Sequence, residues 1–462
     1  MEQTTAKKNK YEIDMCNGTI MDKLISFSLP LMLSGILQLM FNAVDIIVVG
    51  RFSGSQALAA VGSTSALINV FTNLFIGISL GANVLTARFY AAGREKEVSE
   101  TVHTAITLAL ISGIAMALVG LVFSRGALAL MGTPDDVIGL SALYMRIYFL
   151  GMPFFMLYNY GAAILRAVGD TKRPLLFLMI AGVINACLNM VLVIVFKLGV
   201  AGVAIATVIS QMISCVLVLR CLCQSESSYR LRFSELVMKG YYLKQIFSVG
   251  VPAGIQSTVI NFSNVLLQSS VNSFGSTAMA GYTAANNLLG FLYVSVNSIT
   301  QACMSFTSQN YGVGKLKRMD RVLADCMILS VVVAVVLGCI CYGFGPEILQ
   351  IYTEDAEVIA CGMEILAYTT ITYFLCGWMD LFPGALRGMG YSAVPMVLSV
   401  IGTVGTRVVW IFGIFPYHRS LAILFISYPA SWIITIILQV VCFYFVRRRV
   451  HRRSQALAGQ EG

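Results

Sequence analysis

Runs of about twenty apolar residues recur along the whole chain, separated by short segments that contain charges, glycine or proline. A helix of this length crosses the hydrocarbon core of a bilayer, about 30 Å thick. Of the 462 residues, 58% are hydrophobic and 11% charged, against about 25% charged in soluble domains. The sequence therefore predicts an all-α integral membrane protein with twelve transmembrane helices. The expected spans are residues 24–49, 57–82, 102–123, 141–164, 174–196, 200–222, 244–272, 278–303, 326–344, 359–386, 394–415 and 421–446.

Basic residues are concentrated in alternate connections between these spans. If the amino terminus is cytosolic, 25 of the 31 Lys and Arg residues fall in cytosolic segments, as the positive-inside rule requires. We therefore expect a multi-pass protein of the cell membrane, bacterial in origin, with both termini cytosolic. The net charge of +9 then reflects topology and contact with membrane lipid, and we expect no nucleic-acid partner.

The chain contains an internal repeat. The segment 163–169 matches 384–390, other segments match at the same offset, and Pro30 matches Pro252 at an offset that is longer by one position. We expect an amino-terminal bundle of six helices in residues 1–222, a cytosolic linker in 223–243, and a second bundle with a basic tail in 244–462. Because six is an even number, the repeats are parallel, and two bundles around a central cleft are typical of secondary transporters.

Two motifs suggest a family. Pro30 is followed by Gln38, Asn42 and Asp45 in the first helix, and a Leu-Arg motif occurs at repeat spacing, at Arg166 and Arg387. With the two six-helix halves, this sequence resembles the multidrug and toxic compound extrusion (MATE) family. The resemblance implies an antiporter that exports cationic or amphipathic organic compounds, driven by protons or sodium ions, with no other cofactor.

We interpret the repeated Leu-Arg motif, together with Pro30, as structural. Arg166 and Arg387 precede glycines at the ends of helices, where glycine permits a turn and arginine reaches the lipid headgroups.

Asp45 is the first candidate for ion coupling, because a carboxylate inside a membrane helix is costly and functional by default. Gln38, Asn42 and Asp45 are spaced by four and three residues, which places them on one helix face. Their oxygens suit a sodium ion, and a dehydrated carboxylate equally suits a proton. The alternative is that these polar residues only join helices.

Further candidates in the amino-terminal half are Asn185, Asn189 and Thr207. The resemblance implies that they join Asp45 in a cation-binding network. Many family members carry a second aspartate where this chain has Asn189, so a single formal negative charge remains. The alternative for Asn185 and Asn189 is hydrogen bonding between helices.

In the carboxy-terminal half, Asp380 is the only acid well inside a predicted helix, with a proline three residues later. The resemblance implies a second ion or substrate site, with Asn261 and Asn264 as its partners. Family members tend to carry a glutamate near the position of Asn261, and its absence weakens this site.

Absent motifs bear on the other classes of function. The sequence contains no P-loop, no Gly-x-Ser-x-Gly and no His-Glu-x-x-His, so we expect neither an enzyme nor an ATP-driven pump. No metal is expected beyond sodium at Asp45, and we expect a monomer. The main alternative is a flippase for lipid-linked or amphipathic intermediates, to which Arg407 points; a membrane-embedded transferase or a sensor is a third.

Overall fold

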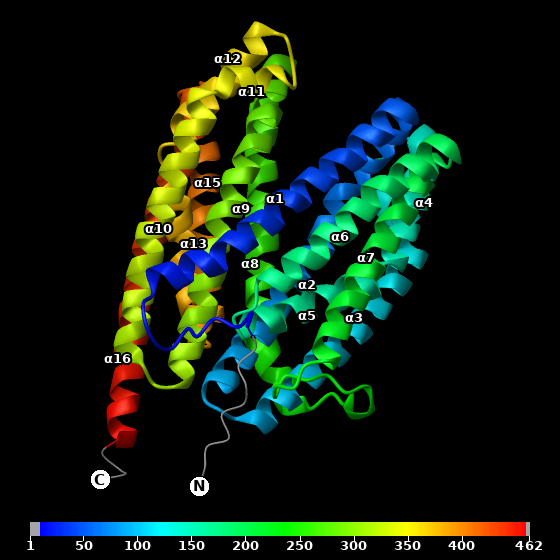
Figure 1. Ribbon diagram of the computed structural model, residues 1–462. Helices are drawn as coiled ribbons and strands as arrows, with labels where there is room; N and C mark the ends of the chain where they lie inside the picture. Colours follow the sequence, from blue (N-terminus) through cyan, green and yellow to red (C-terminus); the bar gives the residue numbers. More distant parts are fainter. Residues whose placement is uncertain (1–9, 459–462) are drawn as a thin grey trace. The chain divides into compact units, whose positions relative to one another are not determined.

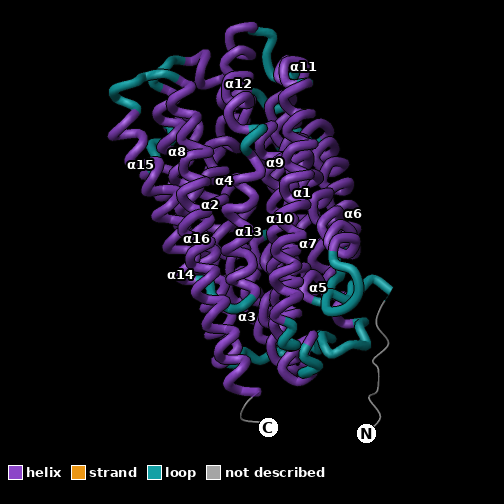
Figure 2. Tube along the Cα trace, turned by 90° about the vertical axis from the view of Figure 1, so that its left-hand side faces the viewer, coloured by secondary structure: helices purple, strands orange, loops and turns teal. Residues whose placement is uncertain are grey.

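The computed structural model describes residues 10–458, and within that range it consists of helices joined by short loops, without strands (Figures 1 and 2). Residues 1–9 and 459–462, at the outer ends of the two expected halves, lie outside the described residues. The helices of the first half are α1 (Met21–Phe52), α2 (Ser55–Ala91), α3 (Glu95–Leu130), α4 (Asp135–Leu150), α5 (Met152–Ala167), α6 (Lys172–Asn189), the π-helix η1 (Met190–Val195), α7 (Gly199–Cys223) and the 3-10 helix η2 (Phe233–Glu235). Those of the second half are α8 (Gly240–Asn272), α9 (Ser276–Gly312), α10 (Leu316–Gly343), α11 (Gly345–Gln350), α12 (Ala356–Thr369), α13 (Tyr373–Gly388), α14 (Ala393–Ser399), the π-helix η3 (Val400–Gly405), α15 (Thr406–Val409), the π-helix η4 (Trp410–Ile414) and α16 (Leu421–Ala458).

These helices account for the twelve expected crossings. Within the described residues, 8 helices are long and apolar enough to cross a membrane, and two bent pairs, α4 with α5 and α12 with α13, raise the number to 10. The remaining two, α8 and α9, have 33 and 37 residues, which at about 1.5 Å per residue exceeds the bilayer core. They carry more polar residues than the others, which is why composition alone marks them less clearly. The protein is thus a twelve-helix membrane protein, as the sequence predicts.

Two expected spans differ from the prediction because each is broken. The span expected at 141–164 is α4 and α5, which meet at 47°, and the span expected at 359–386 is α12 and α13, which meet at 51°. At the first break Pro153 stands in the first turn of α5, where it lacks an N–H and its ring excludes a continuous helix. At the second break the hydroxyls of Thr369, Thr370 and Thr372 hydrogen-bond to backbone carbonyls three or four residues earlier, and such bonds bend helices.

The chain forms two compact units, and each unit takes a segment from the first helix of the other half. Of the described residues, unit 1 comprises 10–14 and 33–251, and unit 2 comprises 15–32 and 252–458. The chain passes from one unit to the other within α1, after Met32, and within α8, after Val251. A proline lies beside each of these points, Pro30 in α1 and Pro252 in α8.

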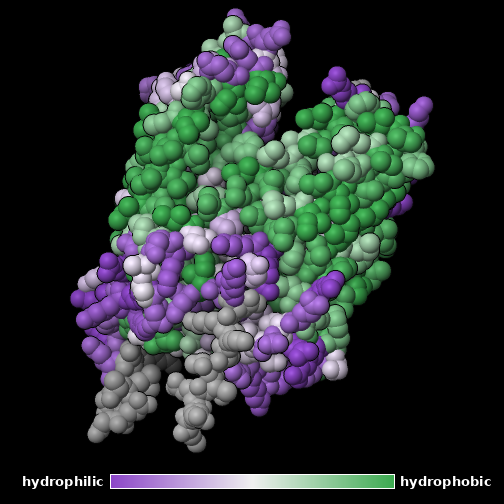
Figure 3. All heavy atoms as spheres, in the orientation of Figure 1, coloured by the Kyte–Doolittle hydropathy of each residue, from purple (hydrophilic) through white to green (hydrophobic). Residues whose placement is uncertain are grey.

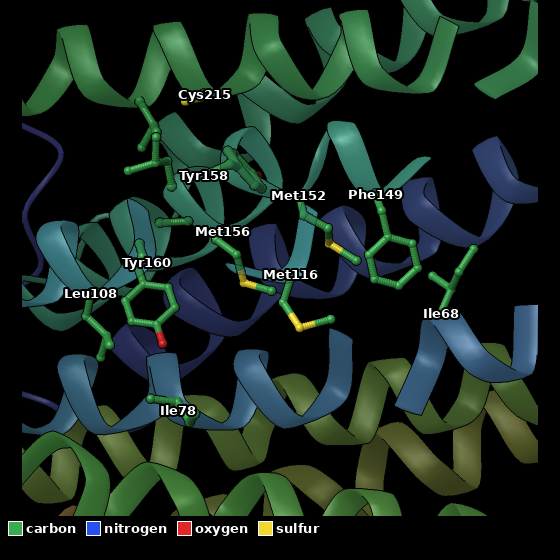
Figure 4. Packing of buried hydrophobic residues seen from close by; sticks show 14 of the residues in the cluster. Ile68, Ile78, Leu108, Met116, Phe149, Met152, Met156, Tyr158, Tyr160 and Cys215 are labelled. Atoms are coloured by element: carbon green, nitrogen blue, oxygen red, sulfur yellow. The ribbon is translucent and has the colours of Figure 1, made fainter. Parts of the chain in front are cut away.

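The core of unit 1 is formed by α2, α3, α4, α5 and α7 (Figure 4). Met116 on α3 lies beside Met152, Met156 and Tyr160 of α5, and each of these is at most 6% exposed. Glycine lets α3 approach the α4–α5 break: a Cβ on Gly113 would lie 2.5 Å from Pro153 Cα. Close backbone approach of this kind is typical of helix packing in membranes.

The core of unit 2 is richer in aromatic side chains. Tyr282 of α9 stacks with Phe425 of α16 at a centroid distance of 6.3 Å, and Tyr373 of α13 packs edge-on to Trp432 of α16 at 5.6 Å. Offset and edge-to-face rings add specificity to the packing.

The internal repeat is visible in the backbone of each half. Gly169 has φ 97°, and its repeat counterpart Gly390 has φ 92°, so both Leu-Arg motifs end in the left-handed turn that glycine permits. The π-helices η1 and η4 also stand at nearly equivalent places, whereas η3 belongs to the second half alone.

On the face drawn in Figure 3, hydrophobic residues cover the sides of the helices and hydrophilic residues gather at their ends. Many large apolar side chains of the molecule are exposed; on α3, Leu118, Val122 and Phe123 are 59%, 68% and 63% exposed. Exposed apolar side chains in this number are stable only against lipid tails.

Candidate functional site

Unit 1 places the Asp45 carboxylate among three of the predicted residues. Asn189, the last residue of α6, donates a hydrogen bond from Nδ2 to Asp45 Oδ1 on α1 and another, 3.2 Å long, to Asn185 Oδ1. Thr207 on α7 lies close to the same carboxylate, and its hydroxyl donates to Val203 O at 3.0 Å. Three helices therefore converge on Asp45.

The local sequence explains this convergence. Asn185 and Asn189 are four residues apart and so share one face of α6. One turn before them, Gly182 lies against the ring of Phe41, which is itself one turn before Asp45 on α1. The missing side chain at Gly182 leaves room for the Phe41 ring between α1 and α6, about one turn from the place where Asn189 bonds to Asp45. The π-helix η1 begins directly after Asn189, a distortion that is frequent at functional sites.

The cluster is unusual in its charge. Asn185 and Asn189 are 5% and 0% exposed, and within residues 10–458 no Lys or Arg forms an ion pair with Asp45. Asn189 Oδ1 is buried and has no hydrogen-bond partner. A carboxylate oxygen, two amide oxygens and a hydroxyl thus meet without a positive charge, which is a donor set that hard cations prefer.

Gln38 and Asn42 are not part of this cluster. Both are exposed, and in the described part of the chain neither forms a hydrogen bond with Asp45. Gln38 and Asn42 share a face of α1 with Asp45 but lie about two turns and one turn before it along the helix, and the hydrogen bond from Asn189 goes to Asp45. Their role remains a prediction.

Three residues near Asp45 were missed in the sequence. Tyr144 and Tyr148 of α4 stack at a centroid distance of 6.1 Å and interact electrostatically with Asp45. Gln211 of α7 lies close to Tyr148, and its buried Oε1 has no hydrogen-bond partner among the described residues. Gln211 follows Thr207 by four residues, so the spacing that linked Asn185 to Asn189 also indicates it, but the tyrosines gave no such signal.

In unit 2, Asp380 of α13 is half-buried and interacts with Arg387, two turns later on the same helix. Arg387 is 9% exposed and donates from Nη2 to Gln256 Oε1 of α8 at 2.6 Å. The expected contact of Arg387 with lipid headgroups is therefore replaced by a buried contact inside the unit. Its repeat counterpart Arg166 is half-exposed and interacts with Tyr158.

The two asparagines expected beside Asp380 lie elsewhere. Asn264 accepts a hydrogen bond from Nη1 of Arg407 at 2.7 Å, and Asn261 is exposed. No hydrogen bond among the described residues joins either of them to Asp380. The charged neighbour of Asp380 is therefore the buried Arg387, and the two expected amides are not its partners.

No group of three or more His, Cys, Asp or Glu residues that could hold a metal ion occurs in the part of the chain that the structure describes. Asp45 is instead surrounded by neutral dipoles, the arrangement described above.

A repeated bundle of twelve membrane-spanning helices, with a half-buried carboxylate inside a span that accepts a hydrogen bond from an amide, defines a membrane transporter. The MatE family profile matches the chain twice, at residues 30–191 and 252–412. The two matches begin at Pro30 and Pro252, and they are displaced from each other by the same offset as the sequence repeat, which confirms the repeat. The chain belongs to the MATE family of membrane transporters.

Relatives and solved structures agree with this membership. The chain is 31% identical over 436 residues to the probable multidrug resistance protein YoeA of Bacillus subtilis (strain 168), covering 92% of this chain and 93% of the relative. It is 22% identical over 382 residues to the multidrug export protein MepA of Staphylococcus aureus (strain NCTC 8325 / PS 47), covering 82% and 84%. A multidrug resistance MATE family transporter solved in an outward-facing conformation shares the fold, with a TM-score of 0.87 at 19% identity over 97% of this chain and 100% of that one. A MATE protein solved in a bent conformation has a TM-score of 0.85 at 19% identity over 96% and 98%.

Proposed function

We propose that the protein is a secondary active antiporter that exports cationic or amphipathic organic compounds in exchange for protons or sodium ions by alternating access. The observation that carries this proposal is the Asp45 cluster, in which a membrane-buried carboxylate is held only by neutral groups. A buried charge without a counter-ion is costly. A bound cation or proton would remove that cost, and the cluster is therefore the coupling site of the proposal.

A sodium ion would use oxygens that are already gathered. The Asp45 carboxylate, Asn185 Oδ1, Asn189 Oδ1 and the Thr207 hydroxyl would serve as ligands, and the unpaired Asn189 Oδ1 supports this assignment. Hard cations are bound in proteins by such oxygens.

A proton would use the same residues differently. Protonation of Asp45 turns one carboxylate oxygen into a donor. Rotation of the Asn189 amide would then present Oδ1 as the acceptor in place of Nδ2, which now donates to Asp45. With either ion, one carboxylate balances one positive charge, so the proposal assigns one ion to this cluster.

Coupling requires that ion binding favours one state of the transporter and compound binding favours the other. The second candidate site, Asp380 with Arg387, would then take the compound or a second ion. Neither Asn261 nor Asn264 is hydrogen-bonded to Asp380 among the described residues. In this proposal they would contribute to the second site only through Arg407, which bonds to Asn264, or in another conformation of the transporter.

The remaining assignments follow the same proposal. The distribution of Lys and Arg supports a cell-membrane protein with both termini in the cytosol and the linker 223–243 between two functional halves, and we propose a monomer in lipid. Two relatives are named for multidrug resistance or export, which supports drug-like cargo. These names do not favour the flippase.

Transport by purified protein in liposomes tests the proposal. Ethidium uptake would be followed under an imposed pH gradient in sodium-free buffer, and separately under a sodium gradient at equal pH. We expect one gradient to drive uptake, and Asp45→Asn to abolish the dependence on it. The control is Asp320→Asn, which removes a carboxylate that pairs with Arg447 and is 31% exposed. Folded protein that moves no cation under either gradient would overturn the proposal and favour the flippase.

A further inference from the structure

Arg407 is a buried cation in unit 2 that the coupling cluster does not use. It lies in α15, between the π-helices η3 and η4, and is 3% exposed. Its guanidinium stands 4.7 Å from the ring centroid of Tyr428 on α16. Arginine keeps its charge under all physiological conditions, so this position needs compensation.

No carboxylate supplies that compensation within the described residues. The charged and titratable neighbours of Arg407 are Tyr282, Tyr373, Cys376 and Tyr428, and neither Tyr nor Cys is an anion near neutral pH in its ordinary state. Asp380 of α13 interacts with Arg387 instead. Among the described residues, no negative charge of the protein balances the positive charge of Arg407, and an anion bound from outside would balance it.

The hydrogen bonds of Arg407 leave one edge of the guanidinium free. Nη1 donates to Ser263 Oγ at 2.8 Å and to Asn264 Oδ1 at 2.7 Å, both on α8. Nε is buried and has no partner, and none of the described hydrogen bonds uses Nη2. The N–H groups of Nε and Nη2 form the planar fork that binds carboxylate and phosphate with two parallel bonds. The contacts to α8 hold the group in place while this fork stays unpaired.

The repeat places this arginine where the other half has its cation cluster. At the offset that relates Gly169 to Gly390, Tyr428 corresponds to Thr207, and Thr406 and Trp410 correspond to Asn185 and Asn189. At the offset that relates Pro30 to Pro252, Leu267 corresponds to Asp45. The second half thus lacks the carboxylate and carries a guanidinium on the equivalent helix, so the polarity of the site is reversed.

We infer that Arg407, fixed by Ser263 and Asn264, is a binding site for the anionic group, a carboxylate or phosphate, of an amphipathic compound. Tyr428 covers one face of the guanidinium, and the free fork takes the two oxygens. This inference extends the proposed export function to zwitterionic and anionic amphiphiles. It rests on the proposed function in one respect, namely that the bound compound is a transported substrate.

Equilibrium binding of a matched pair of dyes tests it without any gradient. Rhodamine B carries a free carboxylate beside its cationic ring system, and its ethyl ester lacks the negative charge. We expect purified protein in neutral detergent to bind rhodamine B about tenfold more tightly than the ester, because a charge-assisted bidentate contact is gained. We expect Arg407→Gln to abolish this preference by weakening the binding of rhodamine B more than that of the ester, and Arg407→Lys, which keeps the charge but not the fork, to retain part of it.

The matched control is Arg419→Gln, which removes a more exposed arginine of the same unit that bonds to Ser273 and should leave the preference intact. Equal affinities of wild-type protein for the two dyes would overturn the inference, and this result does not depend on any variant folding. Arg407→Gln that weakens both dyes equally would show a structural role and overturn it too.

Competition with lipids distinguishes the two sources of the anionic group, which are a membrane lipid and a transported compound. If the fork takes a lipid phosphate, phosphatidylglycerol will displace rhodamine B from wild-type protein and phosphatidylcholine will do so less; if it takes cargo, neither lipid will displace the dye. Both outcomes support an anion site. Failure of gradient-driven ethidium transport with the dye preference intact would refute the antiport proposal alone, and transport without the preference would refute the anion site alone.

Discussion

Gly182 on α6 lies so close to Phe41 on α1 that a Cβ on the glycine would overlap the edge of the Phe41 ring at Cε2 and Cζ. The two residues are each about one turn from the Asp45 cluster, on the same two helices. Contact between α1 and α6 and the geometry of the cluster therefore depend on the same missing side chain.

Gly182→Ala should separate these helices. We expect a loss of about 1 to 3 kcal/mol in the free energy of unfolding, as for other overpacked cores, and a weaker ion dependence of transport as Asn189 leaves Asp45. Thermal unfolding in detergent and gradient-driven uptake measure the two effects. Gly126→Ala on α3 is the control, since a Cβ there meets nothing within 4 Å. Equal effects of both variants would contradict the argument.

Asn189→Asp should change the charge of the cluster from one to two carboxylates. If sodium is the coupling ion, we expect the sodium concentration for half-maximal exchange to fall about tenfold or more, because a unit charge a few ångströms away contributes several kcal/mol at an effective dielectric constant of about 20. If protons couple, the pH dependence of exchange should become steeper, since two groups then titrate. A variant with unchanged ion dependence would show that Asn189 does not face the ion.

Gln256→Leu should destabilise unit 2, because it leaves the buried Arg387 guanidinium without its 2.6 Å hydrogen bond. Loss of a hydrogen bond to a charged group costs about 1.5 to 3 kcal/mol. A double-mutant cycle with Arg387→Met isolates the interaction. We expect the double variant to be less destabilised than the sum of the single variants; simple additivity would mean that the bond contributes nothing.

The ion pair between Arg447 on α16 and Asp320 on α10 should matter much less. Its side chains are 42% and 31% exposed, so solvent screens the attraction. We expect Asp320→Asn to change the free energy of unfolding by at most about 1 kcal/mol, as measured by thermal unfolding at low and high salt. A larger, salt-insensitive loss would indicate a buried role for this pair.

The sequence was sufficient for the helices and the repeat, because apolar length and the constant offset between matching segments are properties of the chain itself. It did not reveal the breaks between α4 and α5 or between α12 and α13, since the composition stays apolar across both. Pro153 is the local sign at the first break, and the threonines from Thr369 to Thr372 are the sign at the second.

The candidate sites could be predicted only in part, because several of their contacts join residues that are far apart in the sequence. Asn185 and Asn189 share a helix face, and the structure joins them to Asp45. Arg387 was expected at the headgroups, but its partner Gln256 is 131 residues away in the chain, and no spacing rule relates them. Asn264 was expected beside Asp380, but it bonds to Arg407, again over a distance that only the tertiary packing defines.

The exchange of helix segments between the units bears on how the chain is made. A ribosome completes residues 33–239 before it reaches 240–251, which unit 1 also contains, and residues 15–32 emerge long before the rest of unit 2. Unit 1 therefore cannot be complete when only the first half of the chain has been synthesised. The first part of α1 belongs to unit 2, and the helices with which it packs there are synthesised later, in the second half of the chain. Domains usually fold in order as they emerge. Here unit 1 is complete only once residues 240–251 have emerged, and unit 2 only once the rest of the second half has been made, so two fragments cut within residues 223–239 would each need the other to mature.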